Sequence, residues 1–136
     1  MFIVAGLDAC TGVRSVLCLH ETVCTGAADG FGRMNRRPAC TLLHLGPGLA
    51  NGIANLHNAR RARSPVINLV GDMATWHNAS HDAPLCMNIA AIAATVGCVI
   101  TCGPEPEQVG RHVARAIAAT TVPASALASR VGAYAM

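Results

Sequence analysis

The stretch ACTLLHLGPGLANGIANLHNARR, residues 39–61, decides the fold of this chain. It opens with Ala39–Leu45, a mainly apolar run whose length and composition are typical of a buried strand. The tripeptide Gly46-Pro47-Gly48 then predicts a tight turn, because glycine and proline favour turn geometry. Leu49–Arg61 follows, with apolar residues at helical spacing. A strand that leads directly into a helix is the repeating unit of parallel α/β sheets.

The same alternation continues on both sides of this unit. Strands are predicted at Val13–Leu19, Ala39–Leu45, Val66–Val70 and Cys98–Thr101. Helices are predicted at residues 2–9, Glu21–Met34, Leu49–Arg61, Met87–Val96 and Glu105–Ala119, with a long loop from Gly71 to Pro84. Because the strands are continuous apolar runs, the sheet should be covered on both faces. The predicted fold class is therefore α/β: a three-layer sandwich with a mostly parallel sheet flanked by helices on both faces, incomplete at both ends.

The length of 136 residues predicts one domain, which we assign to residues 1–120. Residues 121–136 are rich in Ala and Ser and are interpreted as a divergent tail. No convincing final strand is expected there.

Composition and charge exclude several classes of function. Hydrophobic residues make up 52% of the chain and charged residues 12%, with a net charge of +3. All ten basic residues are Arg, and they form no long run with interleaved aromatic residues, which argues against nucleic-acid binding. The most apolar stretch, Ile89–Thr101, is too short to cross a bilayer, and the N-terminus does not resemble a signal peptide. We therefore expect no membrane association and a cytoplasmic location.

The cysteine and histidine patterns predict no metal site. The seven Cys include no CxxC pair, which favours small apolar thiols in a reducing compartment. The six His lack a metal-ligand spacing. His77 and His81 lie four residues apart in the predicted loop, where solvated residues are favoured over zinc ligands or catalytic groups.

Candidate chemistry gathers where predicted strands end, because parallel sheets bind ligands beyond the carboxyl ends of their strands. Glu21 lies there and begins a helix with almost no side-chain bulk. Its position alone allows simple compensation of the helix dipole. Its apolar neighbours instead predict a raised pKa, which is useful for proton transfer. Gly46-Pro47-Gly48 is either an ordinary turn or a backbone left bare so that a flat ring can approach.

Three segments in order carry a family resemblance. They are the His-Glu pair at 20–21 with Gly26–Arg33, the run Arg37–Asn51 with its Gly-Pro-Gly, and Ser64–Ile67 at matching spacing. Together they resemble the N-terminal pyrimidine-binding (PYR) domain of thiamine-diphosphate enzymes, with the closest likeness to acetolactate-synthase large-subunit-like proteins. The resemblance covers residues 7–97.

The resemblance implies a cofactor and a reaction. Glu21 would hydrogen-bond a pyrimidine nitrogen of thiamine diphosphate and so activate the cofactor toward a 2-oxo acid, for decarboxylation or carboligation. His44 is implied as a second catalytic residue that relays protons, because benzoylformate decarboxylases carry a histidine in the same Leu-His pair. A histidine that only fills the strand end is the alternative. The implied cofactor-binding residues are Glu21, Gly46, Pro47, Gly48 and Asn51.

The sequence also departs from the family pattern. Gly71-Asp72 is followed by Met73, whereas the diphosphate site needs Gly-Asp-Gly and a downstream Asn. The family's usual first strand is absent before Met1. We therefore expect a separate diphosphate-binding domain or chain that holds Mg²⁺, a homo-oligomer in the complete enzyme, and no activity from the isolated chain. The alternatives are a non-catalytic remnant or interaction module, and an unrelated nucleotide-binding α/β domain. Glu21 beside a bare turn argues against the last.

Overall fold

Residues 2–74, 82–97, 99–102, 106–121 and 131–135 are described by the computed structural model of the chain. The helices are α1 (Phe2–Asp8), α2 (Glu21–Asn35), α3 (Leu45–Ala62), α5 (Ile89–Val96) and α6 (Val109–Thr121), with a 3₁₀ turn at Pro106–Gln108. The strands are β1 (Ala39–His44), β2 (Val66–Gly71), β3 (Val99–Cys102) and β4 (Val131–Ala135). Among these helices, none is both long and apolar enough to cross a membrane.

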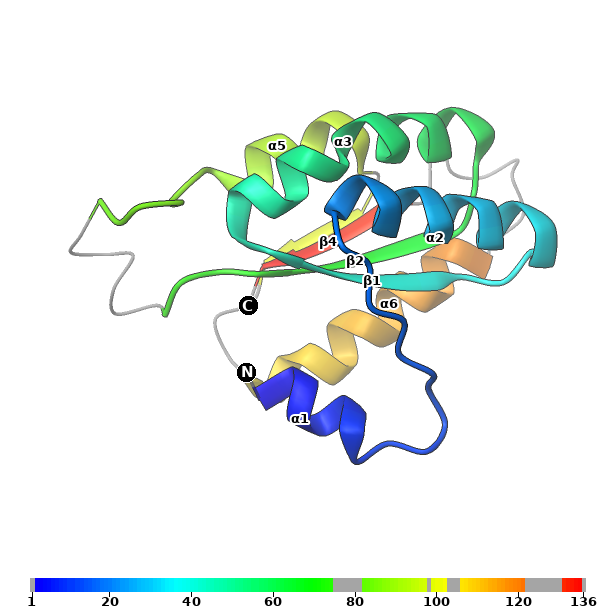
Figure 1. Cartoon of the computed structure of the whole chain (residues 1–136), viewed down its shortest axis with the longest axis horizontal. Coiled ribbons are helices and arrows are strands. Elements are labelled where there is room, and N and C mark those ends of the chain that lie inside the picture. The colour runs from blue at the N-terminus through cyan, green and yellow to red at the C-terminus, as the bar shows by residue number, and fades with distance from the viewer. Residues whose placement is uncertain (1, 75–81, 98, 103–105, 122–130, 136) are drawn as a thin grey trace.

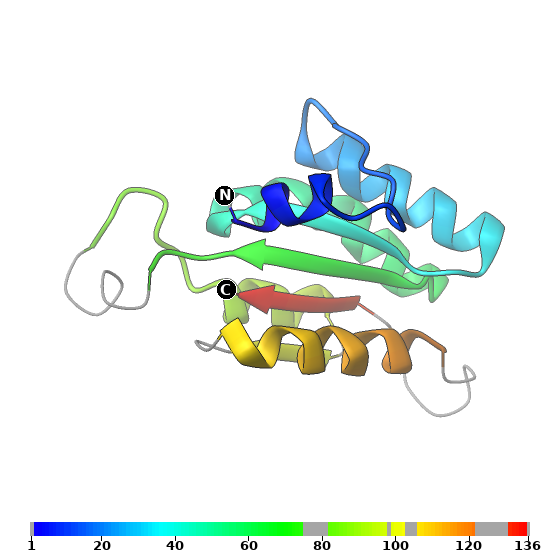
Figure 2. The same cartoon turned by 90° about the horizontal axis from the view of Figure 1, so that it is seen from below.

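The strands form one parallel sheet in the order β1-β2-β4-β3. β1 pairs with β2 from Ala39↔Val66 to His44↔Gly71, so the two strands end level with each other. Figure 1 shows α2, α3 and α5 on one side of the sheet and α1 and α6 on the other. The view from below shows the sheet between these two layers (Figure 2). The predicted α/β sandwich with a parallel sheet is confirmed.

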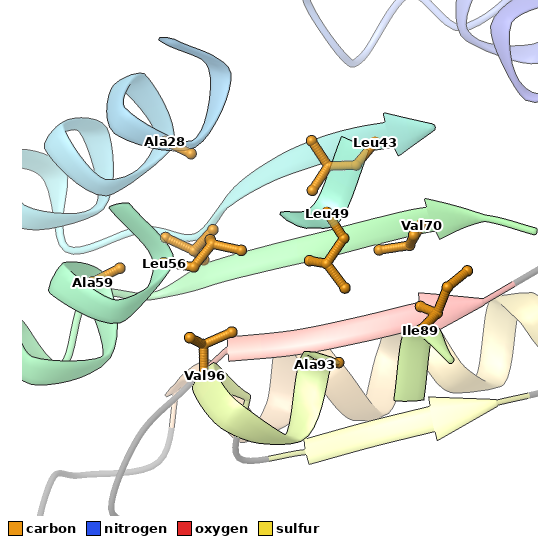
Figure 3. Close-up of a cluster of buried hydrophobic side chains, with 10 residues drawn as sticks. Ala28, Leu43, Leu49, Leu56, Ala59, Val70, Ile89, Ala93 and Val96 are labelled. Carbon is orange, nitrogen blue, oxygen red and sulfur yellow. The ribbon is translucent and has the colours of Figure 1, made fainter. Parts of the chain in front are cut away.

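The main core lies between the sheet and helices α3 and α5. Leu43 from β1 and Val70 from β2 meet Leu49 and Leu56 from α3 and Ile89 from α5, all at most 5% exposed (Figure 3). Replacing a leucine in such a core by alanine costs about 2–5 kcal/mol. A smaller cluster on the opposite face of the sheet joins β2 to α6 and consists of Ile67, Leu69 and Ala116.

Helix α2 packs against α3 through small residues. A Cβ atom on Gly26 would lie 2.9 Å from Nδ2 of Asn55, and one on Gly52 would lie 2.7 Å from Cγ2 of Thr25. Both distances are shorter than a carbon–carbon or carbon–nitrogen contact of about 3.5 Å allows, so a larger residue at either position would displace the facing side chain. Gly26, which lowers helix propensity by about 1 kcal/mol, therefore serves the close approach of the two helices, whereas Gly32 lies against Pro65.

The predicted strand at Val13–Leu19 is wrong. This segment is irregular, and Leu17 and Leu19 are 90% and 96% exposed. It runs from α1 on one side of the sheet to α2 on the other (Figure 1). An apolar run becomes a strand only when a neighbouring strand pairs with its backbone N–H and C=O groups. None of the strands in the described ranges pairs with it.

The predicted tight turn at Gly46-Pro47-Gly48 is also wrong, because all three residues lie in the first turn of α3, which begins at Leu45 rather than Leu49. The chain changes direction at Leu45, whose φ of 57° lies in the left-handed region that bulky residues rarely adopt. Pro47 is tolerated in the first helical turn, since an N–H there would have no intrahelical partner.

The expectation of a tail without a final strand is corrected by β4. This strand lies between β2 and β3 and pairs in parallel with both, from Val66↔Val131 and from Val99↔Gly132. Residues as small as Ala and Gly have low intrinsic strand propensity. The pairing partners on both sides, rather than the local sequence, therefore define β4.

Candidate functional site

The candidate site lies at the carboxyl end of β1, where α2 and α3 both begin. Glu21 is the first residue of α2, and His44 is the last residue of β1. A small open hollow of about 170 Å³ joins them and is lined by Cys18, Leu19, His20, Glu21, Leu42 and His44. The hollow thus opens at the end of a parallel strand, where folds of this class bind ligands.

Glu21 is positioned by the cap of α2. Nδ1 of His20 accepts a hydrogen bond from the backbone N–H of Thr22 over 3.1 Å. The backbone of His20 is extended, with φ −154° and ψ 146°, so the helix begins at Glu21. Because the histidine provides the side-chain cap, the carboxylate of Glu21 is available to face α3.

The carboxylate of Glu21 contacts two residues of α3. Nδ2 of Asn51 donates a hydrogen bond to Oε2 of Glu21 over 3.2 Å. A Cβ atom on Gly48 would lie 3.4 Å from Oε1, so the glycine leaves room for the carboxylate. The structure therefore brings Glu21, Gly48 and Asn51 together, with His44 in the same hollow. Their binding roles stay predictions.

The pKa of Glu21 is lowered from its ordinary value of 4.5, which corrects the raised value expected from sequence. The largest cause is a hydrogen bond from its own backbone N–H, followed by the hydrogen bond from Asn51. Burial acts in the opposite direction, and the nearby His20 and His44 lower the pKa further. The apolar neighbour Leu19, which suggested burial, is itself almost fully exposed. Glu21 is therefore an ionised acceptor at neutral pH.

Gly46 and Pro47 are placed differently from Gly48. A Cβ atom on Gly46 would lie 2.3 Å from Cβ of Met87, so the lack of a side chain at Gly46 serves packing against the segment before α5. Pro47 is half-buried in the first turn of α3. The structure thus separates the two glycines, since one accommodates Met87 and the other accommodates Glu21.

A polar clasp, which sequence reasoning missed, fixes α2 against α3. The hydroxyl of Thr22 donates to the carbonyl of Asn51 over 2.8 Å, and Nδ2 of Asn55 donates to the carbonyl of Thr22 over 2.7 Å. One turn further along α2, the hydroxyl of Thr25 donates to the carbonyl of Gly52 over 3.2 Å. The signal in the sequence was the helical spacing of the two Thr and the two Asn. These bonds set the separation between Glu21 and Asn51.

The apolar walls of the hollow were also missed. Leu42 and His44 alternate with buried residues along β1 and therefore share one face of the strand. That alternation was a usable signal, whereas the contribution of Cys18 and Leu19 depends on how the irregular segment runs. In the described part of the chain, no group of three or more His, Cys, Asp or Glu could hold a metal ion. His77 and His81 lie outside the described residues.

Comparison with known proteins assigns the family. Residues 1–92 match the family described as "Thiamine pyrophosphate enzyme, N-terminal TPP binding domain". The chain therefore belongs to this family. Over 120 residues, 88% of its length, it is 52% identical to the Mycobacterium tuberculosis protein named "Putative acetolactate synthase large subunit IlvX". Over 58 residues, 43% of its length, it is 41% identical to benzoylformate decarboxylase of Pseudomonas aeruginosa.

A solved structure supports the same assignment. The crystal structure of benzoylformate decarboxylase from Polynucleobacter necessarius matches 94% of this chain with a TM-score of 0.79 and 25% sequence identity. The chain spans 23% of that structure, 23% of the mycobacterial relative and 11% of the Pseudomonas enzyme. It therefore corresponds to one part of much longer proteins.

Proposed function

We propose that this chain provides the pyrimidine-binding half of a thiamine-diphosphate site in an enzyme that acts on 2-oxo acids, by decarboxylation or carboligation. The observation that carries this proposal is the hydrogen-bonded pair of Glu21 and Asn51 beside Gly48 at the carboxyl end of β1. The names of the relatives, an acetolactate synthase and a benzoylformate decarboxylase, support the substrate class.

The residues around the hollow fit an aminopyrimidine ring. Leu19 and Leu42 offer apolar surface, and Glu21 offers a carboxylate acceptor at the edge. A flat ring with a protonated nitrogen would find both a surface to lie on and a charge-assisted hydrogen bond. Glu21, Gly48 and Asn51 are proposed to form this site, with Gly46 and Pro47 supporting it from the first turn of α3.

The cofactor, when bound, supplies the electron sink for the carbanion chemistry of a 2-oxo acid. Glu21 is ionised because its pKa is lowered, so it stabilises a protonated ring nitrogen by accepting its hydrogen bond. Asn51 holds the carboxylate in position, and Leu19 and Leu42 line the hollow beside it. His44, in the same hollow, is proposed to hold or pass a proton on the substrate side.

The diphosphate and Mg²⁺ are assigned to a separate domain or chain. Gly71-Asp72-Met73 lacks the second glycine of a Gly-Asp-Gly motif, and the chain spans only 23% of its mycobacterial relative. We place the complete enzyme in the cytoplasm as a homo-oligomer, in which a diphosphate-binding partner covers the open hollow beside Glu21.

A non-catalytic interaction module is the second candidate function. The segment Val13–Leu19 favours it, because Val16, Leu17 and Leu19 are 68%, 90% and 96% exposed, and exposed apolar groups of this size mark interaction surfaces. In this alternative the chain binds a related subunit without binding the cofactor.

Calorimetry distinguishes the two functions. Thiamine diphosphate and Mg²⁺ would be titrated into the chain alone and into the chain mixed with the region of the mycobacterial relative that it does not cover. Binding heat in the mixture, lost in Glu21→Gln and kept in Glu107→Gln, supports the cofactor site; Glu107 is an exposed acid in the 3₁₀ turn before α6. Association of the two chains without any cofactor heat would support the interaction module instead.

A further inference from the structure

His20 borders the hollow, but the proposed function uses it only as the cap of α2. The side chains with nitrogen or oxygen atoms that line the hollow are His20, Glu21 and His44. Glu21 is proposed to meet the pyrimidine ring, and His44 is proposed to hold or pass a proton. His20 is exposed as well as capping the helix. The side of its ring that faces away from α2 therefore has no assigned role.

The cap of α2 fixes which nitrogen of His20 carries the proton. The backbone N–H of Thr22 donates to Nδ1 over 3.1 Å. A neutral imidazole has one acceptor nitrogen and one N–H group, so a ring that accepts at Nδ1 carries its proton on Nε2. The fold thus holds His20 as an N–H donor at Nε2, and the same hydrogen bond fixes the orientation of the ring.

Nε2 of His20 is free to donate to a ligand. The two nitrogens of an imidazole lie on either side of one ring carbon, so their hydrogen-bonding directions diverge. With Nδ1 turned toward the backbone of α2, Nε2 is turned away from it. Within the described residues, Nε2 has no hydrogen-bond partner. An oriented N–H group at the edge of a hollow is the kind of polar group that orients ligands in binding sites.

The other polar groups beside the hollow are already engaged. Nδ2 of Asn51 donates to Glu21, and the hydroxyl of Thr22 donates to the carbonyl of Asn51. The ionised carboxylate of Glu21 can only accept hydrogen bonds. Among the described residues that line the hollow, none is a Lys or Arg that could bind an anion. His20 is therefore the donor that remains, beside His44, for an acceptor group of the substrate.

The strongest hydrogen-bond acceptor of a 2-oxo acid is its carboxylate, because the negative charge strengthens the bond. We propose that Nε2–H of His20 donates to this carboxylate, which makes His20 a substrate-binding residue. This role rests on the proposed function, since it requires a 2-oxo acid beside Glu21.

The hydrogen bond from His20 should strengthen substrate binding rather than accelerate the reaction. The carboxylate gives up its negative charge as it leaves as carbon dioxide, so a hydrogen bond to it is strongest before the reaction. Loss of the bond should therefore raise KM without lowering kcat. A proton-transfer role, as proposed for His44, would instead lower kcat.

Two substitutions separate the cap from the donor. In His20→Asn, the side-chain oxygen can replace Nδ1, because Asn is among the best cap residues, but the short amide does not reach the position of Nε2. In His20→Gln, the amide nitrogen reaches about as far as Nε2, but Gln is not among the residues favoured as caps. His20→Asn should thus remove the donor, and His20→Gln should remove the cap.

Substrate binding is measured on the chain mixed with the region of the mycobacterial relative that it does not cover, with thiamine diphosphate, Mg²⁺ and either pyruvate or benzoylformate. His20→Asn should raise KM by about 10–100-fold, the effect of losing a hydrogen bond to a charged group. His20→Gln should retain most of the affinity. His57→Asn is the matched control and should leave KM unchanged, because His57 is exposed on α3 and does not line the hollow.

Two measurements on the chain alone test the geometry without cofactor or substrate. Urea unfolding should show an unchanged folding equilibrium constant for His20→Asn and a roughly fivefold lower one for His20→Gln, which has lost a helix cap. Nitrogen-15 NMR of the histidine-labelled chain is recorded at mildly alkaline pH. The signals that His20→Asn removes should show a protonated Nε2 and an unprotonated Nδ1.

The role of His20 is overturned by a protonated Nδ1, by an unchanged KM in His20→Asn, or by a fall of kcat in that variant without a rise in KM. An equal rise of KM in His20→Asn and His20→Gln would also overturn it, because the amide of Gln should replace the N–H donor. Calorimetry on the same mixtures measures cofactor binding. If the natural chain binds no cofactor, the proposed function fails and this role fails with it. If all variants bind cofactor and share one KM, only the role of His20 fails.

Discussion

One face of β1 is buried in the core and the other is exposed beside the candidate site. Thr41 and Leu43 face α3 and are each 2% exposed, whereas Leu42, between them, is 40% exposed and His44 is exposed as well. The buried face packs into the main core, and the open face lines the hollow beside Glu21. One strand of six residues therefore stabilises the fold with alternate side chains and shapes the candidate site with the others.

The largest expected effect of a substitution is at Glu21, which lines the open hollow. Glu21→Gln should reduce decarboxylation by the reconstituted enzyme by about 10²–10⁴-fold, because an amide cannot stabilise a protonated ring nitrogen as a carboxylate does. Folding should change little, since Glu21 is only half-buried. Turnover and urea unfolding measured on the same preparation check both parts. Near-normal turnover would remove Glu21 from the proposed mechanism.

The next largest effect lies on the buried face. Leu43→Ala should lower the free energy of unfolding by about 2–5 kcal/mol, because it removes apolar contacts and leaves a cavity in the core. Leu42→Ala is the matched control on the neighbouring residue and should cost less than about 1 kcal/mol, as surface substitutions usually do. Urea unfolding of the two variants measures the difference. Equal losses would show that the two faces of β1 do not differ as described.

The order in which strands alternate with helices could be read from the sequence, but the pairing partners of each strand could not. The runs Ala39–Leu45 and Val66–Val70 predicted two strands, which the structure has at Ala39–His44 and Val66–Gly71, because local pattern and tertiary pairing agree there. Val13–Leu19 shows the same kind of pattern without a described strand to pair with, and it is irregular. Val131–Ala135 shows a weak pattern and is a strand, since β2 and β3 supply partners on both sides. Strand formation in this chain depends on pairing that no local pattern contains.

The sequence predicted which residues lie together at the candidate site better than it predicted the protonation of Glu21. The order of motifs pointed to Glu21, Gly48 and Asn51, which the structure brings together. The predicted rise in the pKa of Glu21 was wrong. Hydrogen bonds at the start of α2 lower this pKa, and they outweigh the effect expected from apolar sequence neighbours. The left-handed Leu45, on which the start of α3 depends, had no signal in composition or spacing.

A smaller effect distinguishes two acids on α2. Asp29 is buried and accepts hydrogen bonds from Arg33 and Ser64, while Glu21 faces the open hollow. Burial alone would raise the pKa of Asp29, but these hydrogen bonds lower it below its ordinary value of 3.8. A lowered pKa contributes stability above the unfolded value, and this contribution is lost as pH falls through the folded value.

Asp29→Asn should therefore lower the free energy of unfolding by about 1–3 kcal/mol at neutral pH. The difference from the natural chain should shrink as pH falls from 3.8 through the lowered pKa of the folded state, because the folded carboxylate is protonated only below that lower value. Urea unfolding at a series of pH values gives both curves. A difference that stays constant across the acid range would mean that the charge of Asp29 does not stabilise the fold.

The smallest effect separates the two glycines at the start of α3. Gly46→Ala places a Cβ atom 2.3 Å from Cβ of Met87 and should cost about 1–3 kcal/mol of stability through overpacking. Gly48→Ala places it 3.4 Å from Oε1 of Glu21, a tight contact that a half-buried carboxylate can relieve by moving, so its stability cost should stay below about 1 kcal/mol. A shift of the Glu21 carboxylate disturbs its hydrogen bond from Asn51. Gly48→Ala should therefore weaken cofactor binding, measured by calorimetry on the mixed chains. Gly46→Ala should mainly lower the unfolding midpoint. If the Gly48→Ala variant binds cofactor as tightly as the natural chain, the carboxylate of Glu21 does not need the space beside α3. The residues that position the cofactor would then have to lie on the β1 side of the hollow.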